Sequence, residues 1–424
     1  MNPRITTLPS GLRVATETMD HLQSVAIGVY VQAGSRDEGA REHGLAHLLE
    51  HMAFKGTTTR SAREIAEAIE NVGGEINAAT SNETTTYYAR VLKDDMPLAV
   101  DILADILVNS RIDADELARE QHVILQEIGA AHDTPDDVVF DRFTEAAYED
   151  QPIGRSILGT PESVEALTGE DIRTYLGRHY AADRMVVAAA GAVDHDAFVR
   201  EVERRFASLP TAASAEQPAG ADYRGGEFRE ARDLMDAQLV LGFEGRAILG
   251  RDFYCSQVLA NVLGGGMSSR LFQRVREERG LCYSVYAFHW GFSDTGLFGV
   301  HAATGEDDLA QLWPVIVEEL KRAADDITDE EAGRSRAQMR AGLLMAQESP
   351  GARASQIGRQ LLLFDRVMPN EELLDRLSAI DATRLRDLAG RLFQNTPLTV
   401  SSVGPVRHLA SRDEIARSLG RSLH

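Results

Sequence analysis

Two segments of the chain match each other at a constant spacing, and this internal repeat constrains the fold more than any other feature. The segment ALTGEDIRTYLGRHYAADRMVVAAAGAV begins at Ala166, and AIDATRLRDLAGRLFQNTPLTVSSVGPV begins at Ala379, an offset of 213 residues in a chain of 424. Each copy predicts a helix capped by Thr168 or Asp381, followed by a β-branched strand that ends at a glycine. An offset of half the chain length indicates tandem duplication of one domain.

The domain organisation follows from this repeat. The segment PTAASAEQPAGADYRGG is rich in small residues, Pro and Gly and has no hydrophobic periodicity, which is typical of a linker. We predict a first domain over residues 1–208, a linker over 209–222 and a homologous second domain over 223–424. In each half, strand patterns give way to long helical patterns. The predicted fold class is therefore α+β, with each domain a mixed sheet that has helices packed on one face.

Charge and composition exclude several functional classes. The formal net charge is −22, whereas a nucleic-acid-binding protein needs a basic face, so we expect no nucleic-acid partner. The negative charge suits basic or neutral ligands and also favours solubility, and both explanations stay open. The two cysteines, Cys255 and Cys282, predict no disulfide framework. With no signal-peptide pattern and no apolar run long enough to span a bilayer, we expect a cytoplasmic protein that does not bind membranes.

The stretch HGLAHLLEHMAFKGT carries the most specific chemical signal. It places His47 and His51 four residues apart, with Glu50 directly before the second histidine. On a helix these three side chains project from one face. Two imidazoles at this spacing can bind one Zn²⁺, and the carboxylate can take a proton from a metal-activated water. A helix face that carries these residues by chance is the alternative that the spacing alone leaves open.

A catalytic zinc site also needs a third protein ligand. The segment DADELAREQHVILQEIGAAHD predicts a long helix in which Glu120 and Glu127, seven residues apart, share a face. One of these carboxylates could bind the metal while the other accepts a hydrogen bond from a ligating histidine. On the pattern alone, a solvated charged face is the more common explanation.

With these motifs the chain resembles the insulinase/pitrilysin family of zinc metallopeptidases, because HLLEH is the inverted zinc motif H-x-x-E-H. The motifs are closest to those of the processing peptidases of the family and their bacterial two-domain relatives. In the family, the third ligand falls on Glu127, 76 residues after His51, and a supporting glutamate falls on Glu120. The resemblance implies that Glu50 is the general base. It also implies one Zn²⁺ per chain, bound by His47, His51 and Glu127.

Further motifs extend the resemblance over nearly the whole chain. The segment SSRLFQRVREERGLCYSVYAF resembles the family's distal signature and implies that Arg276 and Tyr283 contact the substrate backbone and help to stabilise the tetrahedral intermediate. Without the resemblance, structural roles in a charged helix and a strand are the more common explanation for these two residues. The second half has no histidine or glutamate where the first has its zinc motif, so only the first domain is expected to bind metal. The alternating segment GGEINAATSNETTTYYARV resembles a strand that offers backbone partners to an extended peptide. Its implied substrate-binding residues are Asn77, Ala78, Ala79 and Thr80.

Three more residues are implied as parts of substrate pockets. Phe54 matches a phenylalanine in the pocket for the residue after the cleavage site, and core packing is an equal alternative. Asp137 and Asp141 match an acidic pair that receives an arginine just before the cleavage site. Acidic residues that favour a helix start are the alternative explanation for this pair.

The motifs and the resemblance predict a zinc-dependent endopeptidase that hydrolyses peptides or unfolded, targeting-like segments. By analogy with the family, Arg276 and Tyr283 of one copy would face the zinc of a second copy in a closed homodimer. Two alternatives stay open. One is a non-catalytic structural subunit of the same fold, against which the complete zinc motif counts. The other is a catalytic subunit that needs a different partner chain.

Overall fold

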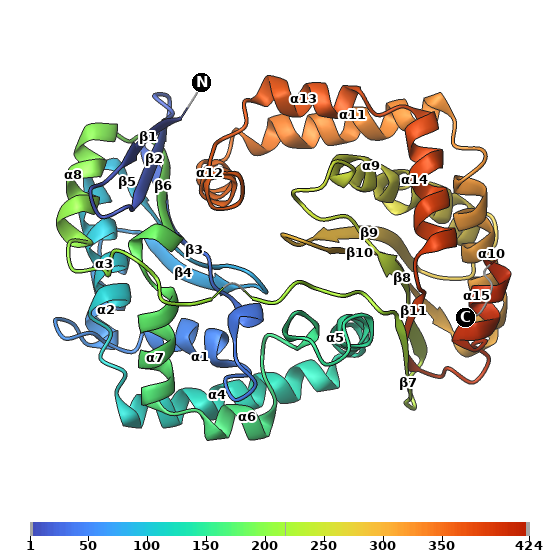
Figure 1. Cartoon of the computed structure of the whole chain (residues 1–424), viewed down its shortest axis with the longest axis horizontal. Coiled ribbons are helices and arrows are strands. Elements are labelled where there is room, and N and C mark those ends of the chain that lie inside the picture. Colours follow the sequence, from blue (N-terminus) through green and yellow to red (C-terminus); the bar gives the residue numbers. More distant parts are fainter. Residues whose placement is uncertain (1–2, 217, 421–424) are drawn as a thin grey trace. The chain divides into compact units, whose positions relative to one another are not determined.

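The computed structural model describes residues 3–216 and 218–420 (Figure 1). Residue 217, in the predicted linker, and the extreme ends of the predicted domains at 1–2 and 421–424 lie outside the described residues. The chain forms two compact units, and each is described by itself. Unit 1 comprises Met1–Gly129, Arg155–Ala219 and Leu343–Pro369, and unit 2 comprises Ala130–Gly154, Gly220–Gly342 and Asn370–His424.

Unit 1 is built on a six-stranded mixed sheet with the order β1-β2-β6-β3-β5-β4, in which only β2 and β6 run parallel. The strands are β1 Arg4–Thr7, β2 Arg13–Thr18, β3 Ser24–Val31, β4 Glu75–Thr80, β5 Thr85–Leu92 and β6 Met185–Gly191. The central strand β6 is buried along its whole length, which explains its continuous apolar sequence. Strand β4 lies at the edge, and its residues alternate in exposure as the sequence pattern predicts.

The helices that follow these strands in the chain give unit 1 its second layer. They are α1 Leu45–Ala53, α2 Ala62–Glu70, α3 Met96–Val108, α4 Ala114–Asp133, α6 Pro161–Ala166, α7 Gly169–His179 and α8 His195–Arg205. Helices α3 and α8 pack on the sheet (Figure 1). Thr168 accepts a backbone N–H bond at the start of α7, so the cap predicted from the sequence is confirmed.

Unit 2 repeats this plan on a five-stranded sheet with the order β7-β11-β8-β10-β9, in which only β7 and β11 run parallel. Its strands are β7 Gly226–Ala231, β8 Asp236–Glu244, β9 Ser284–Gly291, β10 Gly296–Gly305 and β11 Thr399–Gly404. Its helices include α9 Phe253–Gly264, α10 Glu306–Ala323, α11 Asp329–Ala346, α13 Asn370–Ser378, α14 Ala382–Asn395 and α15 Arg412–Ser418. The α+β class predicted for both halves is confirmed.

Two glycines at equivalent positions show how closely the units correspond. Gly191 ends β6 with φ +121°, and Gly404 ends β11 with φ +116°. A Cβ atom at Gly191 would lie 2.3 Å from the carbonyl oxygen of Ser24, and one at Gly404 would lie 2.6 Å from that of Asp236. Only glycine tolerates both the positive φ and the close approach, so the same residue occurs in both copies of the repeat.

The second face of each sheet is covered by a helix from the other half of the sequence. Helix α5 (Pro135–Ala147) packs on β7, β8 and β11, and helix α12 (Pro350–Phe364) packs on β2, β3 and β6. The ring of Phe143 lies over Gly242, and the ring of Tyr30 lies against Gly358. The compact units therefore differ from the continuous division 1–208 and 223–424 at these two helices. Each sheet has helices on both faces rather than on one.

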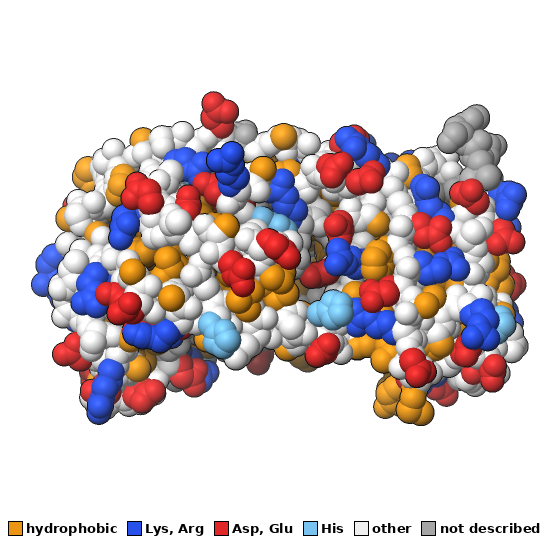
Figure 2. Space-filling model, turned by 90° about the horizontal axis from the view of Figure 1, so that it is seen from below, with side chains coloured by type: hydrophobic (Ala, Val, Ile, Leu, Met, Phe, Trp, Pro, Cys, Tyr) orange, Lys and Arg blue, Asp and Glu red, His pale blue; other side chains and the backbone are white. Residues whose placement is uncertain are grey.

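Three further observations concern membrane-spanning helices, the two cysteines and the distribution of surface charge. No helix in the described part of the chain is both long and apolar enough to cross a membrane. Cys255 and Cys282 are buried free thiols. On the face that Figure 2 shows, acidic and basic side chains are interspersed rather than gathered into a broad basic area.

Candidate metal centre

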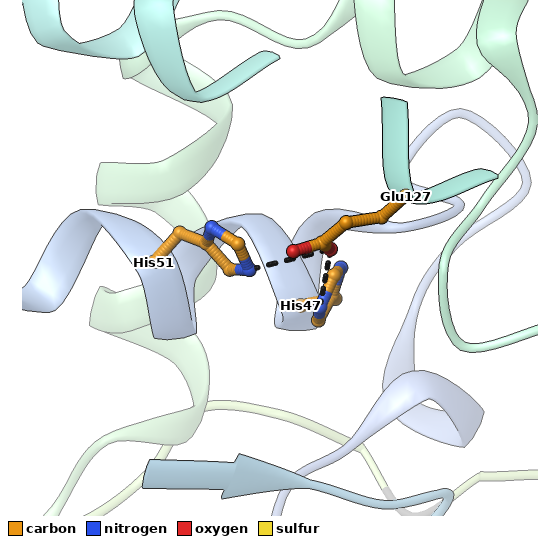
Figure 3. A group of neighbouring side chains, drawn as sticks. All are labelled: His47, His51 and Glu127. Atoms are coloured by element: carbon orange, nitrogen blue, oxygen red, sulfur yellow. Dashed lines mark ion pairs between the residues drawn. The ribbon is translucent and has the colours of Figure 1, made fainter. Parts of the chain in front are cut away.

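Helices α1 and α4 bring together the three residues that the zinc motif and the resemblance single out. The Nε2 atoms of His47 and His51 each lie 3.6 Å from Oε2 of Glu127 (Figure 3). One ligand atom from each residue lies within 4.8 Å of the other two. Over residues 3–216 and 218–420, this is the single group of His, Cys, Asp or Glu side chains found to be arranged so that it could hold a metal ion.

The two nitrogen–oxygen separations of 3.6 Å match those between neighbouring ligands of a tetrahedral zinc ion. Zinc binds nitrogen and oxygen at about 2.0–2.2 Å, which separates neighbouring tetrahedral ligand atoms by about 3.3–3.6 Å. The two imidazole rings have centroids 4.7 Å apart and planes inclined by 72°, so both can direct a nitrogen toward one point. Two nitrogens and one carboxylate oxygen leave a fourth position for water or substrate, as in catalytic zinc sites.

The electrostatics of His47 also suit a metal ligand. Burial is the largest cause that lowers its pKa to about 4, the neighbouring His51 lowers it further, and Glu127 acts in the opposite direction. The imidazole is therefore neutral near pH 7, which is the form that binds metal. Its Nδ1 atom is buried, with no hydrogen-bond partner among the described residues.

A buried carboxylate orients the second histidine. Glu120 is 5% exposed, and its Oε2 lies 3.0 Å from Nδ1 of His51. Because a carboxylate only accepts hydrogen bonds, Nδ1 carries the hydrogen and Nε2 is left with a lone pair directed at Glu127. The other oxygen of Glu120 lies 2.5 Å from Nζ of Lys55. Sequence analysis did not select Lys55, which lies just beyond the end of α1, two residues after Ala53.

Glu50 lies half-buried on α1, between the two histidines in the sequence. Its carboxylate has no hydrogen bond or ion pair with any other described residue, so its oxygens are available to a ligand. Burial is the main cause that raises the pKa of Tyr180 to about 12, and the charge of Glu50 adds to this effect. The carboxylate therefore lies near the buried pair of Tyr87 and Tyr180, whose hydroxyl oxygens are 3.0 Å apart.

The strand expected to bind substrate is the edge strand β4, which contacts helix α1. Among the described residues it pairs only with β5, so one row of its backbone groups is open. Asn77 and Ala79 are exposed, Ala78 is buried and Thr80 is half-buried. The Ala78 N–H donates to Oδ1 of Asn77 at 2.8 Å, so this side chain must move before Ala78 can pair with a peptide.

The structure places the other predicted pocket residues separately. Phe54 is half-buried at the end of α1 and packs against the apolar core of unit 1, which is the core-packing role that the sequence left as an alternative. Asp137 and Asp141 are exposed on α5, in unit 2. They lie four residues apart on this one helix.

Arg276 and Tyr283 come together in unit 2. Arg276 lies in the π-helical turn η5 (Phe272–Glu277), and its guanidinium lies 4.7 Å from the centroids of both the Phe272 and Tyr283 rings. Its Nη1 donates to the carbonyl oxygen of Tyr283 at 2.9 Å. The Tyr283 side chain itself is 83% exposed. The exposed phenol and the guanidinium therefore present two hydrogen-bond donors side by side.

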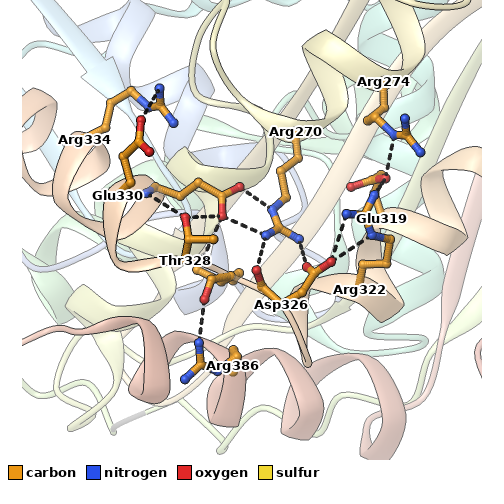
Figure 4. A network of polar contacts seen from close by, with 11 residues as sticks. Arg270, Arg274, Glu319, Arg322, Asp326, Thr328, Glu330, Arg334 and Arg386 are labelled. Atoms are coloured by element: carbon orange, nitrogen blue, oxygen red, sulfur yellow. Dashed lines mark hydrogen bonds and ion pairs between the residues drawn. The ribbon is translucent and has the colours of Figure 1, made fainter.

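A charge network that sequence analysis missed anchors this turn (Figure 4). Arg270, two residues before the turn, contacts Asp326 and Glu331 at 2.5–2.6 Å. Arg274, within the turn, donates to Glu319 at 3.2 Å, and Glu319 is 1% exposed. The run RLFQRVREER was the only available signal, because the carboxylates come from α10, α11 and the segment between them.

A family model described as "Insulinase (Peptidase family M16)" matches residues 13–161, and a second, described as "Peptidase M16 inactive domain", matches residues 166–339. The chain belongs to the insulinase family of peptidases. The resemblance inferred from the zinc motif is thereby confirmed, and the family supports a zinc-dependent peptidase.

Relatives match this insulinase-family peptidase over most of its length. An "Uncharacterized zinc protease" of Rickettsia felis is 40% identical over 405 residues, which are 95% of this chain and 98% of that protein. A "Probable mitochondrial-processing peptidase subunit beta" of Arabidopsis thaliana is 39% identical, over 98% of this chain and 80% of that protein. A protease from Helicobacter pylori shares the fold, with a TM-score of 0.88 and 21% identity over 95% of this chain and 99% of that one.

Proposed function

We propose that this chain is a zinc-dependent endopeptidase whose metal is bound by His47, His51 and Glu127. The convergence of their three ligand atoms within 4.8 Å carries this proposal. Two further observations support it: His47 is neutral because of its burial, and His51 is oriented by Glu120. The names of relatives that are about 40% identical agree with the choice of zinc.

Zinc bound in such a site supplies an activated water and polarises the scissile carbonyl. Glu50 lies one residue before His51 on the same helix, and its carboxylate accepts the proton of the attacking water. The same carboxylate then delivers that proton to the leaving amine. Because Glu50 has no competing hydrogen bond or ion pair among the described residues, its lone pairs are available for this proton transfer.

Substrate binds in an extended form along β4. The open row of backbone groups from Asn77 to Thr80 accepts a peptide as an additional strand. A cavity of about 790 Å³ lies beside β4 on the sheet face and is bordered by α2 and α12. Ile76 and Tyr88 give it apolar walls, and Arg359 lies among its lining residues. A cavity of this size accommodates several side chains of a bound peptide. Phe54, Asp137 and Asp141 stay predictions as determinants of the cleavage site.

Arg276 and Tyr283 complete the proposed machinery. The exposed phenol and the adjacent guanidinium are suited to donate hydrogen bonds to a peptide carbonyl or to the oxyanion that develops from it. By analogy with the family, we propose a homodimer in which this pair of one copy faces the metal centre of the other. A cytoplasmic location likewise stays a prediction.

The decisive experiment measures metal content and peptidase activity on one purified preparation, with wild type beside Glu50→Gln. The substrate is a quenched, arginine-containing peptide of about twenty residues, with mass spectrometry of the products. We expect about one zinc per chain in both proteins and cleavage by wild type alone. A wild type that holds no metal, or cleaves nothing, contradicts a self-sufficient peptidase. Zinc binding without cleavage would instead favour a catalytic subunit that needs a different chain.

A further inference from the structure

The helix that carries both histidines has no capping side chain of its own. Its N-cap residue is Gly44, which has no side chain to accept a hydrogen bond from the first turn. The cap is supplied by Glu38, from the preceding loop. The Gly44 N–H donates to Oε2 of Glu38 at 2.9 Å, and the Ala46 N–H donates to Oε1 at 2.8 Å. Glu38 is 3% exposed.

The position of Gly44 explains why this cap comes from outside the helix. Gly44 has φ +91°, and a Cβ atom there would lie 2.9 Å from the carbonyl oxygen of Leu158. Gly159 has φ +80°, and a Cβ atom there would lie 2.9 Å from the carbonyl oxygen of His43. The two glycines therefore pack back to back and exclude Ser, Thr or Asp at the N-cap. Helices α2, α7 and α8 of unit 1 are instead capped by the side chain of their own N-cap residue, as α2 is by Ser61.

A second contact at this point comes from the segment 156–159, in the same unit. It lies against the start of α1, and Nε2 of His43 lies 2.9 Å from the carbonyl oxygen of Ser156. The start of α1 is thus held by Glu38 and also by the backbone around Gly159. Its first turn can shift only if one of these contacts is lost.

The first turn of α1 matters to the metal centre because His47 is the third residue of the helix. The first N–H groups of a helix have no partner within the helix, and the turn frays when they are not capped. Fraying of this turn displaces His47 from Glu127, whereas His51, one turn later, stays in place. Burial raises the pKa of Glu38 to about 8, against the effect of the two N–H bonds.

We propose that Glu38 is a positioning residue of the metal centre, which holds His47 in register with Glu127 through the first turn of α1. The inference rests on the proposed zinc site. It predicts that loss of the Glu38 carboxylate weakens zinc binding more than it weakens the fold.

The matched control is Glu42, a second carboxylate of the same loop. Glu42 accepts the N–H of Gly39 at 2.8 Å and pairs with Arg178 at 2.5 Å, and its side chain touches no N–H group of α1. Glu38→Ala and Glu42→Ala thus remove the same chemical group and a similar number of contacts. Only the first of them removes the cap of the zinc helix.

The test uses the full chain and three measurements: zinc affinity by competition with a chelator, thermal unfolding without metal, and hydrogen exchange of α1 without metal. We expect Glu38→Ala to bind zinc about tenfold more weakly and to exchange faster in the first turn of α1. Glu38→Gln, whose amide oxygen can accept one of the two N–H groups, should lie between Glu38→Ala and wild type. Glu42→Ala should keep the wild-type zinc affinity even if its unfolding temperature falls.

Equal zinc affinity and equal exchange in Glu38→Ala and Glu42→Ala would overturn the inference while leaving the zinc site intact. A wild type that binds no zinc would instead contradict the proposed function. If Glu38→Ala does not fold, Glu38→Gln and Gly159→Ala carry the same test, since each disturbs one side of the first turn. Wild-type affinity in both of these variants would again overturn the inference.

Discussion

Oε2 of the buried Glu120, which is 5% exposed, lies 3.0 Å from Nδ1 of His51. This contact fixes which nitrogen of His51 is turned toward Glu127. We expect Glu120→Ala to weaken zinc binding by about 10–100-fold, because the imidazole loses both its orientation and its hydrogen-bond acceptor. Titration with a competing chelator measures this loss. Glu116→Ala, which removes a carboxylate of the same helix that pairs with Arg119, serves as the control. Unchanged affinity in Glu120→Ala would show that packing alone orients the ring.

Because the phenol of Tyr283 is exposed, its effect on catalysis can be measured separately from its effect on stability. Tyr283→Phe removes only the hydroxyl group, and because the side chain is 83% exposed the unfolding temperature should not change. If the hydroxyl stabilises the transition state, kcat falls by about 10²-fold while KM changes little. Tyr286→Phe, three residues further along and 37% exposed, is the matched control. A loss that appears in KM alone would assign Tyr283 to substrate binding instead.

The ion pair between Glu17 and Arg353 anchors helix α12 to the sheet of unit 1. Nε and Nη2 of Arg353 donate to Oε2 of Glu17 at 2.9 and 2.6 Å, and Arg353 is 3% exposed. Removing one partner leaves a buried, unpaired charge, so Arg353→Met should lower the free energy of unfolding by about 3–5 kcal/mol. Denaturant unfolding measures this loss, and hydrogen exchange should localise it to α12.

The double variant Glu17→Leu with Arg353→Met provides the control for this pair. Because it removes both charges together, most of the lost stability should return. A double variant that is as unstable as Arg353→Met would show that the two side chains contribute through packing rather than through the ion pair.

The buried His289 predicts a loss of stability in acid. Burial is the largest cause that lowers its pKa from 6.5 to about 4. Between these two pH values the unfolded chain binds a proton that the folded chain does not bind. The free energy of unfolding therefore rises with pH across this window and falls on acidification, by up to about 3 kcal/mol.

His289→Gln removes this contribution, so unfolding of the metal-free protein at pH 7 and pH 4.5 should differ less in the variant than in wild type. The exposed His408→Gln should leave the difference unchanged. Equal pH dependence in wild type and His289→Gln would contradict the assignment and point to the other buried histidines, such as His179.

Local spacing was enough to predict the helix of His47, Glu50 and His51 and the caps of α7 and α14. These features depend on residues within about one or two helical turns of one another, and such neighbours are set by the chain itself. The duplication was equally visible, because its spacing is constant along the sequence. Glu127 needed the family resemblance, since nothing local distinguishes a metal ligand from a solvated glutamate on a charged helix.

The tertiary structure alone decided which sheet α5 and α12 each cover and which residue caps the zinc helix. The apolar stripe of a helix such as α5 or α12 predicts that it packs on a sheet, but it does not specify which of two similar sheets. Glu38 became a cap only because Gly44 and Gly159 approach too closely for a side chain at the N-cap. The sequence by itself thus determined the ligand-bearing helix and the repeated fold. The contacts that hold that helix in place join residues that only the packing of the chain brings together, so no local sequence pattern predicts them.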